Sequence, residues 1–197
     1  MSEQVPAFAL RACYAMLAAI ALTAMSGCAH APRVATPSSD AKDLNDWQAS
    51  GRIAVSGANA GGSGSFTWHQ HGANTQVHLR GPIGIGSLQL TLTDSTMRID
   101  TADGQMFEAD AAQSELTARL GAFVPARNLR YWLVGTAAPG EHQWTNEGDT
   151  ATLTQQGWRI DYQRFAVTGG ARLPMKLIAV SGPAKVRILI DRWNLGR

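Results

Sequence analysis

The most reactive side chain of this sequence is the thiol of Cys28, which directly follows Met25-Ser26-Gly27 at the end of an apolar run. Arg11 supplies a positive charge before that run, and the residues from Ala12 to Ala24 are apolar except for Thr23. The run is shorter than the roughly 20 residues that a helix needs to span a bilayer. A basic residue, a short apolar run and small residues, in this order, predict a secretory signal that is cleaved close to Cys28.

The four residues Met25-Ser26-Gly27-Cys28 resemble a bacterial lipobox. In that resemblance a peptidase cuts before Cys28, the sulfur carries a diacylglyceryl group, and the new amino terminus is acylated. We therefore expect a signal peptide over 1–27, a lipidated flexible tether over 28–42 and a folded domain over 43–197. The alternative is an ordinary signal peptide, cut nearby, that leaves Cys28 as a free thiol or removes it.

Other groups of reactive residues give no pattern typical of an enzyme. His69 and His71 share one face of an expected strand and could bind a metal, but no cysteine or acidic ligand nearby completes the set. The glycines from Gly81 to Gly86 do not have the dinucleotide-binding spacing, and no Gly-x-Ser-x-Gly elbow occurs. We predict a protein that is not an enzyme, with no metal and no cofactor besides the lipid on Cys28.

Length and charge narrow the class of protein further. About 170 residues would remain after cleavage, which is enough for one domain with a core. Cys13 lies in the expected signal peptide, so no intramolecular disulfide can form. The formal net charge of +2 is spread along the chain without a basic block. This distribution argues against nucleic acid as a partner and against strong electrostatic docking on anionic lipid.

Short segments with a two-residue apolar period predict most of the domain to be antiparallel strands. A short helix over 43–49 is expected first, because Leu44 and Trp47 lie three residues apart. A glycine-rich link over 57–64 would join the first two strands. The expected strands are 52–56, 65–70, 76–80, 87–93, 96–101, 105–109, 142–145, 151–154, 158–162, 175–180 and 185–193.

Two helices are expected to interrupt the strands. One begins near Asp110 and ends near Gly121, and the second runs from Pro125 to Gly135. Ten or eleven short strands cannot form a flat sheet, because their twist accumulates. The fold class is therefore mainly β, an open antiparallel barrel covered by a helical lid, although the helices could equally fill the barrel as an ordinary core.

The apolar positions of these strands and of the second helix predict the lining of the barrel. The predicted lining residues are Phe66, Trp68, Val77, Leu79, Leu88, Leu90, Leu92, Leu129, Trp132, Leu133, Trp158, Ile160 and Tyr162.

A glycine-rich turn between two of these strands carries an apolar residue at its tip. Ile83 stands between Pro82 and Gly84, where polar residues are usual. It could fold back onto the sheet, or it could form a small finger that dips into a membrane or contacts a partner. Burying one such side chain contributes at most about 1.5–3 kcal/mol, which could orient a tethered domain but not anchor it.

Several motifs, taken in order, resemble those of the LolB family of outer-membrane lipoprotein receptors. They are Trp47, Phe66-Thr67-Trp68, Gly81-Pro82-Ile83-Gly84, Tyr131-Trp132-Leu133-Val134-Gly135, Trp158 to Tyr162, and Asp191-Arg192-Trp193. The resemblance implies an open barrel whose cavity takes acyl chains from the periplasmic carrier LolA and delivers lipoproteins to the outer membrane. It places the family's protruding loop residue, usually leucine, on Ile83. Ala29 after the cysteine agrees with outer-membrane placement, because aspartate there can retain a lipoprotein in the inner membrane.

The resemblance also implies partners: a LolA-like periplasmic carrier, lipoprotein acyl chains and outer-membrane lipid, with the domain itself a monomer. Two other functions are open from the sequence. One is a structural envelope lipoprotein with a packed barrel, and the other is a module that carries small hydrophobic ligands without a partner carrier. Continuous space beneath the helices would favour the receptor.

Overall fold

The computed structural model describes residues 44–57, 61–81, 86–120, 123–147 and 150–196. The expected signal peptide and tether, including Cys28, lie outside these residues, as do Pro82, Ile83 and Gly84. No helix among the described residues is both long enough and apolar enough to cross a membrane. The described residues therefore all belong to the predicted folded domain.

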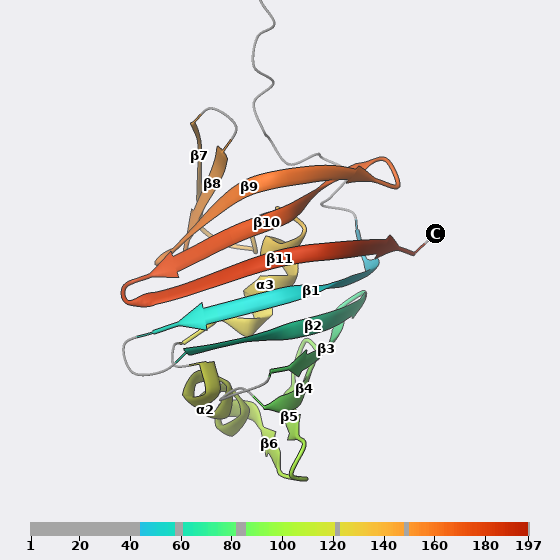
Figure 1. Cartoon of the computed structure of the whole chain (residues 1–197), viewed down its shortest axis with the longest axis vertical. Helices are drawn as coiled ribbons and strands as arrows, with labels where there is room; N and C mark the ends of the chain where they lie inside the picture. Colours follow the sequence, from blue (N-terminus) through green and yellow to red (C-terminus); the bar gives the residue numbers. More distant parts are fainter. Residues whose placement is uncertain (1–43, 58–60, 82–85, 121–122, 148–149, 197) are drawn as a thin grey trace, which may run out of the picture. The chain divides into compact units, whose positions relative to one another are not determined.

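Eleven strands form one antiparallel sheet in the order β6-β5-β4-β3-β2-β1-β11-β10-β9-β8-β7 (Figure 1). Along the chain they are β1 (Asp46–Ser56), β2 (Gly61–His71), β3 (Asn74–Arg80), β4 (Ser87–Leu92), β5 (Met97–Thr101), β6 (Met106–Glu108), β7 (Gln143–Glu147), β8 (Thr150–Gln155), β9 (Trp158–Thr168), β10 (Ala171–Ser181) and β11 (Ala184–Leu195). The first and last strands of the sequence, β1 and β11, pair at its centre, and the described residues show no pairing between the edge strands β6 and β7. The predicted open antiparallel architecture is confirmed.

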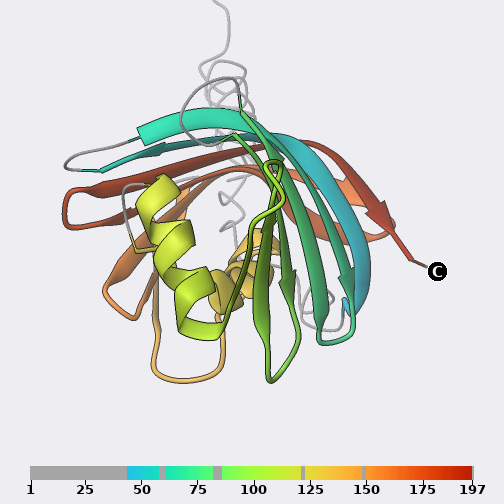
Figure 2. The ribbon, with the colours of Figure 1, turned by 90° about the horizontal axis from the view of Figure 1, so that it is seen from below.

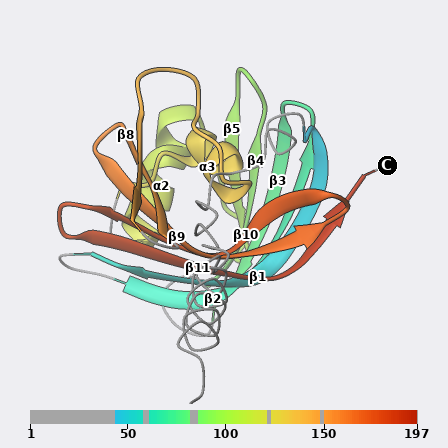
Figure 3. The same cartoon turned by 90° about the horizontal axis from the view of Figure 1, so that it is seen from above.

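Two helices lie on the concave side of the curved sheet (Figures 2 and 3). Helix α2 (Ala109–Leu120) buries Ala112 and Leu116, which are four residues apart and so share one face. Helix α3 (Ala126–Leu133) buries Trp132 and Leu133 among its last residues. The sheet therefore has an apolar inner face covered by helices and an outer face that lies away from them.

The helix expected over 43–49 is wrong, because β1 already begins at Asp46. Trp47 and Ala49 are buried on the inner face of that strand, and Trp47 stacks on Trp68 of β2 with ring centroids 5.7 Å apart. The Trp193 ring of β11 packs edge-on against the Trp47 ring, with centroids 5.3 Å apart. Contacts to both neighbouring strands outweigh a weak local helical spacing.

The glycine-rich link is also shorter than expected, because β2 begins at Gly61 rather than Ser65. A Cβ on Gly64 would lie 2.3 Å from the carbonyl oxygen of Arg80, and a Cβ on Gly61 would lie 2.7 Å from that of Val55. Only glycine permits such a close backbone approach. These glycines extend the sheet instead of loosening a loop.

Irregular pairing bends the sheet around the helices. The register between β1 and β11 shifts at Ser50/Gly51, and that between β9 and β10 shifts between Pro174 and Leu177. Bulges of this kind increase the local twist and bend a strand. The indole of Trp193 donates a hydrogen bond of 2.9 Å to the carbonyl oxygen of Pro174, which satisfies a backbone group next to one of these shifts.

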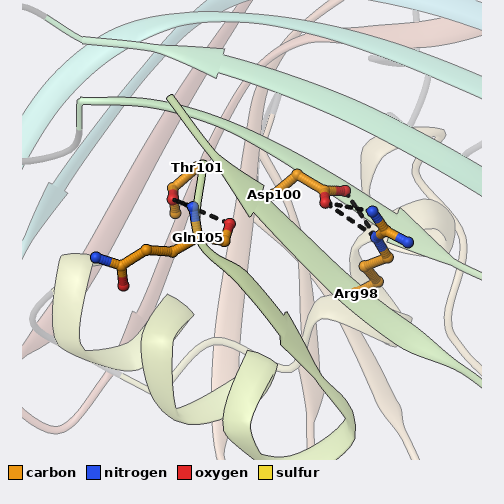
Figure 4. A network of polar contacts seen from close by, with 4 residues as sticks. All are labelled: Arg98, Asp100, Thr101 and Gln105. Atoms are coloured by element: carbon orange, nitrogen blue, oxygen red, sulfur yellow. Dashed lines mark hydrogen bonds and ion pairs between the residues drawn. The ribbon is translucent and has the colours of Figure 1, made fainter. Parts of the chain in front are cut away.

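Polar contacts involve β5 and the turn between β5 and β6 (Figure 4). Arg98 binds both carboxylate oxygens of Asp100, with its Nε atom 3.0 and 2.9 Å from them. Thr101 and Gln105 exchange hydrogen bonds across the turn, and the Thr101 hydroxyl also donates to Asp103. The hydrogen bond from Arg98 holds the pKa of Asp100 below its ordinary value, and that from Thr101 does the same for Asp103.

Candidate functional site

An apolar cavity of about 40 Å³ lies between the inner face of the sheet and the two helices. Its lining surface is entirely apolar. The lining residues are Ile53, Val55, Phe66, Trp68, Val77, Leu79, Leu90, Leu116, Val124, Leu129, Leu133, Val186 and Ile188. Helices α2 and α3 and the segment between them thus cover a hydrocarbon surface formed by β1 to β4 and β11.

Cross-strand register brings the lining residues together. Phe66 pairs with Leu79, while Trp68 pairs with Val77, which in turn pairs with Leu90 on the next strand. Side chains at paired positions point to the same face of a sheet, so three neighbouring strands present one continuous apolar surface. The two-residue period in the sequence is what puts each of them inside.

Seven of the thirteen predicted lining residues border this cavity: Phe66, Trp68, Val77, Leu79, Leu90, Leu129 and Leu133. Leu88 and Leu92 are buried on β4 but do not border it. Trp132 of α3 and Trp158, Ile160 and Tyr162 of β9 are also buried, in a part of the same core that does not border the cavity and that we call the packed region. The alternation of apolar and polar residues identified the inner face of the sheet. It could not show over which half of that face a helix packs closely and over which half a cavity remains.

The packed region is held by a buried polar network around Gln155 of β8. The indole of Trp132 donates to the Gln155 side-chain oxygen at 2.9 Å, and the backbone N–H of Ala138 donates to the same atom at 2.9 Å. The Gln155 amide donates in return to the carbonyl oxygen of Ala138 at 2.7 Å. These bonds fix the end of α3, and the segment after it, against the sheet.

Tyr162 adds a second attachment for the same helix. Its hydroxyl donates a hydrogen bond of 2.9 Å to the backbone oxygen of Trp132, and its side chain is fully buried. Burial raises the pKa of the Tyr162 phenol, so the hydroxyl stays protonated and remains a donor. Tyr162 is therefore a structural residue of the packed region.

Trp68 in the cavity lining is held in place by an aromatic neighbour and by polar contacts. Trp68 borders the cavity and stacks on Trp47, while its indole N–H donates to Gln70 at 3.0 Å. Gln70 also accepts a hydrogen bond from Thr75 at 2.7 Å and donates to the carbonyl oxygen of Gly72 at 2.8 Å. The polar edge of Trp68 is thus satisfied away from the cavity, and only its hydrocarbon surface faces inward.

Six lining residues were absent from the predicted set: Ile53, Val55, Leu116, Val124, Val186 and Ile188. The sequence shows periodic apolar faces that contain Ile53, Val55 and Leu116. The first two border the cavity because β1 pairs with β11 at the centre of the sheet. Val186 and Ile188 alternate with charged or half-buried residues in β11 and could have been found in the same way. Val124 lies just before α3, outside any described helix or strand, and carries no periodic signal.

The cavity can hold apolar groups but carries no chemically reactive residue. At roughly 10–15 Å³ for each water-sized sphere, its volume corresponds to about three waters, and a wholly apolar void of this kind stays dry. It is too small for an acyl chain unless a covering element moves. His71 contacts Asp46 on the surface, and the described residues contain no group of three or more His, Cys, Asp or Glu side chains placed to hold a metal.

A single open antiparallel sheet, curled around two helices over a wholly apolar cavity, defines the class of helix-covered open β-barrels. The family model described as "Outer membrane lipoprotein LolB" matches residues 45–193. The chain belongs to the LolB family, which places it among outer-membrane lipoproteins, and the resemblance noted in the sequence is confirmed.

Individual relatives agree with this assignment. The chain is 33% identical over 192 residues to the outer-membrane lipoprotein LolB of Alkalilimnicola ehrlichii, covering 91% of this chain and 96% of that protein. It is 30% identical over 199 residues to the LolB of Pseudomonas aeruginosa strain PAO1, covering 92% and 97%. Among solved structures, a LolA-superfamily protein of Nitrosomonas europaea aligns with a TM-score of 0.49 and 11% identity, covering 79% and 88% of the two chains.

Proposed function

We propose that the protein is a receptor that accepts lipoproteins from a LolA-like periplasmic carrier and inserts them into the outer membrane. The observation that carries this proposal is the cavity, whose lining is hydrocarbon throughout and lies directly beneath two helices. Acyl chains need no polar partner, so a lining without hydrogen-bonding groups suits them. A lipid on Cys28, which we also propose, would hold this domain at the membrane that receives the cargo.

Acceptance of a chain requires the cavity to enlarge, and we propose that α2 moves while α3 stays in place. Helix α3 is attached to the sheet by the buried bonds of Trp132 to Gln155 and Tyr162. Helix α2 contributes Ala112 and Leu116 as buried contacts, and its Gln113 amide donates to Thr117 within the helix and, at 3.3 Å, to the Val124 oxygen. Displacing α2 leaves these buried bonds of α3 intact.

The energetics of this opening are favourable once a chain enters. Exposing Leu116 costs roughly 1.5–3 kcal/mol, while each methylene group buried in its place contributes about 0.8 kcal/mol. About four buried methylenes offset the loss of Leu116, and an acyl chain offers several more. Transfer from the carrier would thus proceed without ATP if this cavity holds the chains somewhat more favourably, with the bilayer as the final acceptor.

The test is to mix the full chain carrying Cys28→Ala with a LolA-like carrier loaded with lipoprotein, and to measure by pull-down whether the cargo changes hands. Leu116→Asp places a charge in the lining and should reduce acceptance at least tenfold. Ala118→Asp makes the same change on the exposed face of α2 and should leave acceptance near the parent level. Circular dichroism of both variants separates lost acceptance from lost folding.

Absence of transfer to the parent chain would contradict the proposal outright. Equal acceptance by the Leu116 and Ala118 variants, with both folded, would show that the cargo bypasses this cavity. A structural lipoprotein with a packed barrel predicts the first of these outcomes, because its interior would not open. If this protein binds a free fatty acid while the lipoprotein stays on the LolA-like carrier, the result would instead favour a protein that carries small hydrophobic ligands.

A further inference from the structure

A basic area covers the outer face of the central strands. It is formed by Arg52 of β1, Arg159 and Arg164 of β9, Lys176 of β10, and Lys185 and Arg187 of β11. Figure 1 looks onto this side of the sheet, with α3 behind β11 and β1. We call these six residues the outer basic face. They come from four different strands, so no basic block marks them in the sequence.

The register shows how the outer basic face is assembled. Leu189 of β11 pairs with Arg52 on one side and with Lys176 on the other, and Lys176 pairs with Arg164. Two further rows run parallel to this one. Arg187 pairs with Ile178, while Lys185 pairs with Val180, which is paired in turn with Arg159.

Few negative charges compensate this face. The carboxylates that contact these cations are Asp161, 3.0 Å from Arg159, and Asp191, 3.1 Å from Arg52. Lys176, Lys185 and Arg187 make no ion pair with any described residue. Over the whole of β1, β9, β10 and β11, which also contain Arg172, Arg192 and Asp46, eight cations stand against three carboxylates and leave a clear positive excess.

Apolar side chains lie between the cations. Ile178, Val180 and Leu189 are half-buried on the outer face, next to Arg187, Lys185 and Lys176. Cations that flank exposed aliphatic groups are suited to the boundary between lipid headgroups and acyl chains. An acidic protein partner would bind the charges but would gain less from the aliphatic rows.

The opposite sign of charge gathers elsewhere in the sheet. Asp100, Asp103, Glu108, Asp110 and Glu115 belong to β5, β6, α2 and the turns between them. In the strand order, β2, β3 and β4 separate this acidic region from the outer basic face. The domain is therefore electrically asymmetric, and an anionic surface would attract one region and repel the other.

We propose that the outer basic face binds the anionic phospholipid surface of the membrane and so orients the domain on it. Outer-membrane placement of the family puts such a surface within reach. The contact is separate from acyl acceptance, because the six cations lie on the side of the sheet away from the cavity. It adds an electrostatic contact to any lipid anchor, in the way that basic clusters assist singly lipidated proteins.

The experiment measures co-sedimentation of the full chain carrying Cys28→Ala with vesicles, without carrier or cargo. Vesicles that contain phosphatidylglycerol and phosphatidylcholine in equal amounts should bind the protein, and pure phosphatidylcholine should bind it much less. Raising the salt from about 0.1 M to about 1 M, which shortens the Debye length from about 10 Å to about 3 Å, should release it.

Lys185→Gln with Arg187→Gln tests the face directly. A basic residue near an anionic surface contributes about fivefold to partitioning, so the double variant should bind about 25-fold more weakly. Gln76→Glu with Arg98→Gln lowers the net charge equally on β3 and β5, away from the face, and should change binding less than threefold. Equal loss in both variants, or equal binding to both vesicle types, would overturn the proposal.

A complete lack of vesicle binding would also overturn it and would leave an acidic protein as the partner for this face. The cargo-transfer assay contains no vesicles, so its outcome is independent of this one. A double variant that accepts cargo normally but binds vesicles weakly would show that the two activities use opposite sides of the sheet.

Discussion

Replacing Gln155 by leucine should strongly destabilise the domain, because this one side chain serves three buried groups. The change leaves the Trp132 indole N–H, the Ala138 N–H and the Ala138 carbonyl without their present partners. Each buried group left unsatisfied costs about 1–3 kcal/mol. Allowing for partial rearrangement, we expect a loss of about 3–6 kcal/mol in the free energy of unfolding, a large part of the roughly 5–15 kcal/mol that such domains have.

Urea denaturation followed by tryptophan fluorescence measures this loss. With a slope of about 1–3 kcal/mol per molar urea, the midpoint should fall by roughly 2 M. Thr154→Leu, at the exposed neighbouring position of β8, introduces the same side chain and should change stability by only about 0.5 kcal/mol. A loss below about 1 kcal/mol for Gln155→Leu would refute the argument that this network fixes α3 to the sheet.

Two further predictions follow from polar contacts and from the sequence. Arg98 lowers the pKa of Asp100, so the stabilisation from this pair is present above the ordinary pKa of about 3.9 and is lost as the pH falls through the lower folded-state value. Asp100→Asn should therefore lower the melting temperature at neutral pH, and the difference should shrink as the pH falls below the ordinary carboxyl pKa. A difference that does not depend on pH would contradict the assignment. Ile83→Glu should leave folding and acceptance of cargo mostly intact and slow the release of cargo into membranes, measured by transfer from loaded protein to vesicles. Equal loss of acceptance and release would assign Ile83 another role.

Much of this fold was predictable because one face of nearly every strand is buried. Leu88, Leu90 and Leu92 alternate with polar residues, and all three point into the core as expected. The N-terminal part of β1 was not predictable in this way. Trp47 is fixed by two other tryptophans, Trp68 and Trp193, which lie on neighbouring strands, and no local pattern of residues contains that information.

The cavity was predictable only in part, for a physical reason. The apolar period shows which side chains of a strand face inward. Whether a cavity remains depends on the volume of the helix side chains that pack against them. Trp132 fills the region next to Trp158, with ring centroids 6.1 Å apart, whereas Leu129 and Leu133 leave a space opposite Phe66 and Trp68. The outer basic face is non-local for the same reason, since its charges meet only through strand pairing.

The unpaired edges of the sheet bear on how the interior can change size. A closed barrel has its diameter fixed by the number of strands and by their stagger, so widening it means breaking a ladder of hydrogen bonds. Here the order runs from β6 to β7 without closure among the described residues. The circumference can therefore grow by separating two free edges, and every existing backbone hydrogen bond can survive the change. The short β6, with only three residues, also offers little template for another chain to pair with.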